Sequence, residues 1–236
     1  MKDAVPPSPT PTPAATNVVL TAEAVLAHPE VVPLITLADA YLEAIGYTDH
    51  GLPHVTRVAN RAAAVLQDLG YPPREVELAR IAGYLHDIGN VVHRRDHAQS
   101  GALLAIQLLG RMDMPMPEIA RISGAIANHD EGTGEPFSPL SAALIIGDKT
   151  DVLRGRVRNP RMIQHDIHDR VNYAATRSTL TIVDRRTIVL DLTVDTTISP
   201  VVEYFEIFMS RMAMCRRSAE FLNCGFRLVI NGVSLS

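Results

Sequence analysis

The chain has 236 residues, of which 47% are hydrophobic, 5% are aromatic and none is tryptophan. This composition indicates one large domain, or a domain with an appendage, whose core of Ala, Leu, Ile and Val suits closely packed helices. The formal net charge of −4 gives no general attraction to nucleic acid, so no nucleic-acid partner is expected. Two cysteines do not make a disulfide framework, and they fit a reducing compartment. No apolar run reaches about 18 residues, so we expect a cytoplasmic protein without a membrane partner.

The first 17 residues, MKDAVPPSPTPTPAATN, are a low-complexity segment rich in Pro, Thr and Ala. Proline lacks an amide donor and favours extended backbone, so residues 1–17 are predicted to be a disordered tail. The chain that follows has apolar residues at helical spacing up to about residue 155. We therefore predict a helical domain over residues 18–172 and a small α+β appendage over residues 173–236.

Six helices are predicted from the spacing of apolar residues and from helix-breaking residues at their ends. They cover residues 31–46, 53–70, 73–89, 96–112, 116–130 and 138–155. The helix over 73–89 is apolar on most faces, as expected of a central helix. Asp96, followed three residues later by Gln99, is a capping-box pattern at the start of the fourth helix.

The pattern changes after about residue 155. Four arginines in the segment 153–161 are interpreted as part of a surface loop. Residues 177–184 and 186–195 are rich in β-branched residues and flank a short charged turn, which is typical of a hairpin. A helix with a Ser199 cap follows over 199–225, and 226–235 is predicted to be a last strand. The predicted fold class is therefore mainly α, a helical bundle with a small C-terminal β-β-α-β appendage.

The dipeptide His-Asp occurs four times in the chain, at residues 86–87, 129–130, 165–166 and 168–169. The last two lie in a polar stretch, and we interpret them as a solvated helix start with acids near the helix N-terminus. His86 and Asp87 instead end an almost wholly apolar helix, where a buried charge must be paired, hydrogen-bonded or bound to a metal. The alternative is a core histidine that is hydrogen-bonded to a neighbouring carbonyl.

The neighbouring helices each carry an imidazole or a carboxylate near an end or at a break in an apolar stretch. These residues are His54, His97, His129 and Asp148. If neighbouring helices run antiparallel, as short loops favour, their side chains can converge in one pocket with His86 and Asp87. Mixed imidazole and carboxylate ligands suit Fe, Mn, Zn or Ni. The series therefore indicates a metal site.

The ordered series His54, His86-Asp87 and Asp148, with the segment LHDIG, resembles the H…HD…D motif of the HD-domain superfamily of metal-dependent phosphohydrolases. The resemblance implies an HD-domain-like helical bundle in which these four residues hold a divalent transition metal. Fe or Mn is expected first, and Mg, Ni, Co or Zn are alternatives.

Members of the superfamily with two ions add two histidines between the HD pair and the last aspartate. His97 and His129 fit those positions, and the resemblance implies that Asp87 bridges the two ions. The stretch NHDEGTGEP also resembles part of the HHExxDGxGYP signature of HD-GYP cyclic dinucleotide phosphodiesterases. Asn128, Asp130 and Glu135 depart from that signature, so specificity for cyclic-di-GMP is not expected.

We expect a metal-dependent phosphohydrolase that cleaves a phosphoester of a nucleotide or another small phosphorylated metabolite by metal-activated water. Asp87, Asp130 and Lys149 are the predicted catalytic residues, with Asp130 as a proton carrier. Arg94, Arg95 and Lys149 are predicted to bind the phosphate, because Arg offers a planar fork and Lys a point charge. For each basic residue singly, a place in a solvated loop is the alternative.

Two other functions stay open. Some relatives of this fold are mixed-valent di-iron oxygenases, and the ligand set does not exclude that chemistry. In the third interpretation the helical domain binds a ligand or partner through a degenerate site, and the C-terminal appendage forms a homodimer. Asn90 and Asn128 favour this interpretation, because each stands where related proteins carry a Lys or a His.

Overall fold

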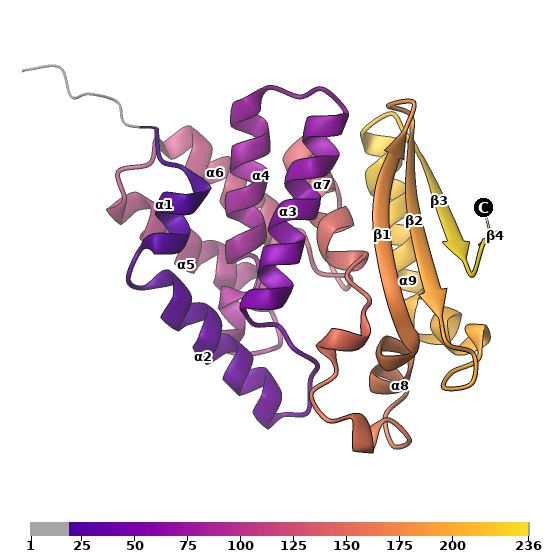
Figure 1. Cartoon of the computed structure of the whole chain (residues 1–236). Coiled ribbons are helices and arrows are strands. Elements are labelled where there is room, and N and C mark those ends of the chain that lie inside the picture. The colour runs from indigo at the N-terminus through magenta and orange to yellow at the C-terminus, as the bar shows by residue number, and fades with distance from the viewer. Residues whose placement is uncertain (1–18, 236) are drawn as a thin grey trace, which may run out of the picture.

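The computed structural model describes residues 19–235 of the chain, so the predicted tail over residues 1–17 lies outside the described residues. The described chain is mainly helical, with one four-stranded sheet near its C-terminus. Figure 1 shows the helical bundle on one side of the molecule and the sheet on the other. Within residues 19–235, none of the helices combines the length and the apolar character needed to cross a bilayer.

Seven helices form the bundle. They are α1 (Ala22–Ala27), α2 (Val31–Ala44), α3 (Leu52–Asp68), α4 (Pro73–Leu85), α5 (His97–Arg111), α6 (Met116–Ala127) and α7 (Pro139–Lys149). Prolines lie in the first turn of α3, α4 and α6, where the missing amide hydrogen costs nothing. Before α7, Ser138 and Ser141 form a reciprocal capping box. Local sequence signals thus set most of the helix starts.

Helix α4 ends at Leu85, four residues earlier than predicted, and a 3-10 helix (Ile88–Val91) follows the His-Asp pair. This 3-10 helix packs closely against α5, because a Cβ atom on Gly89 would clash with the backbone of His97 and Gly101. This close approach lets the start of α5 lie directly against the end of α4. The predicted capping box at Asp96 is wrong, since Asp96 has a φ of 58° and its side chain makes no cap hydrogen bond.

The C-terminal part contains α8 (Ile167–Ala174), β1 (Ala175–Val183), β2 (Thr187–Val194), α9 (Val201–Phe221), β3 (Gly225–Ile230) and β4 (Val233–Ser234). Strands β1 and β2 are antiparallel, β2 and β3 are parallel, and β3 and β4 are antiparallel, in the order β1-β2-β3-β4. Helix α9 is therefore the crossover between two parallel strands.

Two predicted details of the C-terminal part are wrong. The last strand is not continuous over 226–235, because Asn231 and Gly232 both have positive φ, of 51° and 80°, and make a two-residue hairpin turn. Ser199 does not cap α9, since the helix begins at Val201 and the Ser199 hydroxyl donates to Glu203 instead of accepting from a backbone amide.

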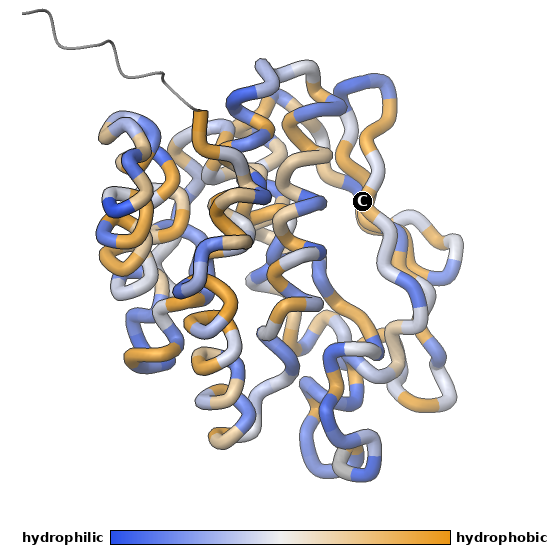
Figure 2. Tube along the Cα trace, turned by 60° about the vertical axis from the view of Figure 1, so that its left-hand side comes forward, coloured by the Kyte–Doolittle hydropathy of each residue, from blue (hydrophilic) through white to orange (hydrophobic). Residues whose placement is uncertain are grey.

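Helix α9 packs against α7 and also against β2 and β3. One cluster of buried residues fills the bundle and includes Ile188 of β2 and Ala219 of α9. A second cluster joins α9 to the sheet and includes Val152 and Val171. Figure 2 shows hydrophobic and hydrophilic residues mixed along each helix, as expected where one face of a helix is buried. The division into 18–172 and 173–236 stays a prediction.

Candidate metal centre

Four histidines surround the carboxylate of Asp87, which lies between α4 and the 3-10 helix. The Oδ2 atom of Asp87 is 3.2 Å from Nε2 of His86 and 3.6 Å from Nε2 of His54. The Oδ1 atom is 3.4 Å from Nε2 of His97 and 3.7 Å from Nε2 of His129. Each carboxylate oxygen therefore faces a different pair of imidazoles.

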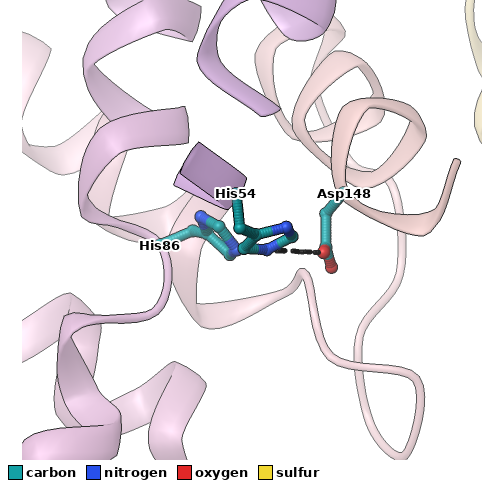
Figure 3. A group of neighbouring side chains, drawn as sticks. All are labelled: His54, His86 and Asp148. Carbon is teal, nitrogen blue, oxygen red and sulfur yellow. Dashed lines mark ion pairs between the residues drawn. The ribbon is translucent and has the colours of Figure 1, made fainter. Parts of the chain in front are cut away.

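Asp148, in the last turn of α7, completes the first of these two groups. Its Oδ1 atom lies 3.5 Å from Nε2 of His54 and 3.8 Å from Nε2 of His86. Figure 3 shows the two imidazoles and this carboxylate turned toward one another, His54 from α3, His86 from the turn after α4 and Asp148 from α7. The structure thus brings all six predicted metal ligands together, over a sequence distance of almost 100 residues.

Each of the four imidazoles is held by a hydrogen bond at Nδ1, which leaves Nε2 directed at the centre. The partners are the carbonyl oxygens of Gly83 for His86 (2.8 Å), Arg94 for His97 (3.1 Å) and Ile126 for His129 (2.6 Å), and the Asp151 carboxylate for His54 (2.8 Å). The three carbonyls each lie three residues before their histidine, so a local turn sets the orientation of those rings. An Nδ1–H donated in this way leaves Nε2 as a free acceptor, as in metal-binding histidines.

The donor set fits a divalent metal ion. The Nε2 atoms of His54 and His86 are buried and, within residues 19–235, have no hydrogen-bond partner. Buried polar atoms without partners are rare because they carry the full cost of desolvation. A metal ion at the point where these atoms converge would satisfy both lone pairs, and imidazole with carboxylate suits a transition metal.

The carboxylates of the centre are kept ionised. Burial alone opposes ionisation of Asp148, but Lys149 and the imidazoles of His86 and His54 outweigh it and hold its pKa well below the usual range. Asp87 behaves in the same way, because His86, His129 and His97 together outweigh its burial and keep its pKa low. Both groups are therefore anionic ligands over the whole physiological range.

The imidazoles differ from one another in the direction in which their pKa is shifted. Burial lowers the pKa of His54 and His129, which keeps these rings neutral, as a metal ligand must be. Burial also disfavours the charged form of His86, but the adjacent Asp87 and Asp148 outweigh it and raise the pKa of this ring. The pair of carboxylates therefore attracts positive charge to the position beside His86.

Asp151 is part of the site and was not predicted from the sequence. It is fully buried, it accepts from Nδ1 of His54, and its Oδ1 accepts from Nε of Arg57 at 2.8 Å. Arg156 is also buried, at 3% exposure, and donates to the backbone oxygens of Asp151 and Asp49, so its assignment to a surface loop is wrong. The only sequence signal for Asp151 is a second aspartate three residues after Asp148.

Lys149, a predicted catalytic and phosphate-binding residue, lies at the centre but is already paired. Only 5% of the residue is exposed, and its Nζ is 2.8 Å from Asp148 Oδ2 and 3.2 Å from Glu131 Oε1. Asp130 lies at the edge of the site, with Oδ1 4.0 Å from Nε2 of His97. Burial opposes its ionisation, but Lys149 and His97 outweigh burial and lower the pKa of the Asp130 carboxyl.

The two predicted phosphate-binding arginines occupy different places. Arg94 is half-buried beside the centre, with Nη1 3.3 Å from Nε2 of His97 and its guanidinium 5.1 Å from the ring of Tyr47. Arg95 is exposed and is not among the residues that line the cavity at the centre.

The other two His-Asp pairs, at residues 165–166 and 168–169, form the solvated helix start that was expected, because Asp166 caps α8 by accepting from the amide of His168.

Residues from distant parts of the chain complete the wall of the site. Nε of Arg211 in α9 forms an ion pair with Oε1 of Glu131 at 2.9 Å, and His50 packs edge-on against His54. Sequence reasoning missed both, since α9 was assigned to a separate appendage and no motif marks residue 50. Together with four of the candidate ligands, Asp87, His97, His129 and Asp148, they line a small cavity of about 20 Å³, which has room for about one water molecule.

Comparison with known proteins identifies the family. A family model described as HD domain matches residues 51–172, which is just over half of the chain. The chain therefore belongs to the HD domain family, a family of metal-dependent hydrolases, and HD domains bind divalent metals.

One curated relative is the uncharacterized protein MJ1020 of Methanocaldococcus jannaschii, which is 30% identical over 146 residues. The match covers 52% of this chain and 56% of MJ1020, so the chain spans little more than half the length of that relative. A crystal structure of a predicted HD superfamily hydrolase from an uncultured Thermotogales bacterium matches with 26% identity and a TM-score of 0.43. That match covers 52% of this chain and 67% of the other.

Proposed function

We propose that this HD domain protein is a phosphohydrolase that cleaves a phosphoester of a small metabolite at a dinuclear metal centre. The observation that carries the proposal is the division of the donors around Asp87, whose two carboxylate oxygens face two different pairs of imidazoles. A carboxylate that bridges two ions requires such an arrangement. Two adjacent ions are the usual device for holding the attacking and leaving oxygens of a phosphoryl group.

The residues present divide into two sets of ligands. His54, His86, Asp148 and Asp87 Oδ2 would hold one ion, and His97, His129 and Asp87 Oδ1 would hold the other. When bound, the ions supply Lewis acidity toward phosphoryl oxygens and lower the pKa of a bound water. Iron or manganese suits this mixture of nitrogen and oxygen donors best, with Mg, Ni, Co or Zn as alternatives.

The remaining polar residues of the site bind the phosphate and move the proton. Arg94 and Arg211 line the cavity and present guanidinium groups, whose planar geometry matches phosphate oxygens. Lys149 balances the negative charge of Asp148 and Glu131, so its role is to keep the carboxylates in place beside the substrate. Asp130, whose lowered pKa holds it in its anionic form, accepts a proton from the attacking water.

The experiment is metal analysis of protein purified without added metal, followed by a phosphate-release screen across sugar phosphates and nucleotides. We expect activity that is lost on chelation and restored by Mn²⁺ or Fe²⁺. Metal at full occupancy with no phosphate release from any substrate would contradict the proposal and support a binding module. A di-iron EPR signal with substrate-dependent oxygen uptake and no phosphate release would contradict it in favour of an oxygenase.

A further inference from the structure

A second, larger cavity lies beside the metal centre, and we call it the α8–α9 cleft. Its volume is about 420 Å³, and its walls come from the loop between α2 and α3, from α8 with its N-cap, and from α9. Three residues line both this cleft and the small cavity at the centre, namely His50, Arg94 and Arg211. The cleft and the small cavity therefore lie side by side, with these three residues between them.

The end of the cleft next to the metals is cationic. Arg94 lies over the ring of Tyr47, and the guanidinium carbon of Arg211 lies 4.7 Å from the centre of the Phe208 ring. Packing on an aromatic ring holds each guanidinium in place, and Arg211 is also ion-paired with Glu131. This end suits a phosphate group.

The other end of the cleft offers hydrogen-bond acceptors. Asn172 of α8 is 4% exposed, and its Nδ2 donates to the carbonyl oxygen of His168 at 2.8 Å, which fixes the orientation of the amide. Its Oδ1 is buried and, within the described part of the chain, has no hydrogen-bond partner. The carboxylates of Asp166 and Asp169 line the same cleft. This part of the cleft wall therefore carries acceptors, two carboxylates and an amide, and it suits a ligand that carries donors.

We infer, resting on the proposed phosphohydrolase function, that the α8–α9 cleft binds the alcohol part of the substrate and selects one rich in hydroxyl groups. The phosphate would lie between Arg94, Arg211 and the metals, and a sugar ring would extend toward Asn172 and Asp169. The volume of the cleft lies within the usual range of small-molecule sites, about 300–1,000 Å³. A sugar phosphate and a nucleotide share this hydroxylated ring.

The inference gives the C-terminal part of the chain a role in specificity. Asn172 and Asp169 belong to α8, and Arg211 belongs to α9, so α8 and α9 supply one wall of the proposed substrate site. A site that hydrogen-bonds a substrate hydroxyl discriminates strongly against analogues without it, because its buried polar groups are then left unpaired.

The test compares ribose 5-phosphate and AMP, whose alcohol parts carry hydroxyls, with phenyl phosphate, which has none. The proteins are metal-loaded wild type, Asn172→Leu, Asp169→Asn and, as a matched control on an exposed face of α3, Asn60→Leu. We expect Asn172→Leu to lower kcat/KM for at least one hydroxylated substrate by about tenfold or more and to leave phenyl phosphate unchanged. Asp169→Asn, which keeps the side-chain shape near the rim, should show the same selectivity if Asn172→Leu does not fold.

Two outcomes overturn the inference, and two others identify the group that the cleft binds. Equal losses for phenyl phosphate and the hydroxylated substrates, at wild-type metal content, would overturn it, as would a wild-type preference for phenyl phosphate. A selective loss confined to AMP identifies a nucleoside as the occupant, and a loss that includes ribose 5-phosphate identifies the sugar ring itself.

Binding is measured separately by calorimetry, so that failure of the inference and failure of the proposed function can be told apart. Tighter binding of ribose 5-phosphate or AMP than of phenyl phosphate, lost in Asn172→Leu, supports the cleft even if no substrate is turned over. Turnover of phenyl phosphate without any preference in binding would overturn the cleft and leave the phosphohydrolase intact.

Discussion

The two halves of the candidate metal centre are built in different ways. The half formed by His54, His86 and Asp148 is enclosed between α3, α4 and α7, and its two imidazole Nε2 atoms are buried without partners among the described residues. In the other half, formed by His97 and His129, the two Nε2 atoms lie 3.2 Å from each other. Each of these nitrogen atoms therefore has a polar contact, unlike the Nε2 atoms of the first half.

The surroundings of the two halves differ as well. Nδ1 of His54 donates to a buried carboxylate, that of Asp151, which in turn accepts a hydrogen bond from Arg57. Nδ1 of His97 instead donates to a backbone carbonyl, and the neighbouring Arg94 and Asp130 are partly exposed at the cavity. The first half is therefore preorganised for an ion, and the second is open to substrate and water. We expect the first position to bind metal more tightly than the second.

The largest effect is expected from residues that serve the first half or both halves. His86→Ala and Asp87→Ala should each abolish tight metal binding, because each removes a ligand and leaves the charges of the remaining buried ligands uncompensated. Elemental analysis of the purified variants measures the loss. His168→Ala, which changes an exposed His-Asp pair, is the matched control and should keep its metal. Full metal content in either variant would place the site elsewhere.

His97→Ala and His129→Ala test the open half alone. Each should lower the metal content from about two ions to one, because the ligands of the enclosed half remain. Activity should fall further than metal content, since one ion cannot clamp both the attacking and the leaving oxygen. Parallel metal analysis and phosphate-release assays check this. One ion per wild-type chain in excess Mn²⁺ or Fe²⁺ would contradict the dinuclear proposal and leave a mononuclear one.

Asp151→Asn tests the support behind the enclosed half. Removing the carboxylate that orients His54 should weaken metal binding by about 10- to 100-fold without abolishing it. Leaving Arg57 and Arg156 beside a neutral side chain should also lower the free energy of unfolding by about 3 kcal/mol. Metal titration and urea denaturation measure the two effects. An unchanged affinity would mean that packing alone positions the His54 ring.

The smallest expected effect is a dependence of metal affinity on pH. Burial disfavours the His86 imidazolium, but Asp87 and Asp148 outweigh it and raise the pKa of the ring above its ordinary 6.5. Metal binding needs the neutral ring, so affinity should be constant above this raised pKa and fall below it, by up to about tenfold per pH unit. Mn²⁺ titrations between about pH 8 and about pH 6 would show this fall. An affinity independent of pH over that range would contradict it.

The sequence alone predicted six of the seven bundle helices and the six candidate metal ligands, but it missed α1 and gave no bounds for α8. Helical spacing of apolar residues, and prolines such as Pro53 and Pro73, act on the backbone within a few residues. Helices that depend on them can therefore be predicted from the sequence. The order of His54, His86-Asp87 and Asp148 is likewise a linear pattern. Because short loops favour antiparallel neighbours, the lengths of the loops between these helices also predict that the side chains converge.

Only the tertiary structure decided where α4 ends and what surrounds the ligands. The helix stops at Leu85, and Gly89 four residues later packs directly against the backbone of α5, a contact that no local pattern encodes. Asp151 became a site residue because its carboxylate meets His54, 97 positions earlier in the chain. Arg211 became one because α9 packs back on α7, and Coulombic and packing contacts of this kind depend on distance in space and not on distance along the chain.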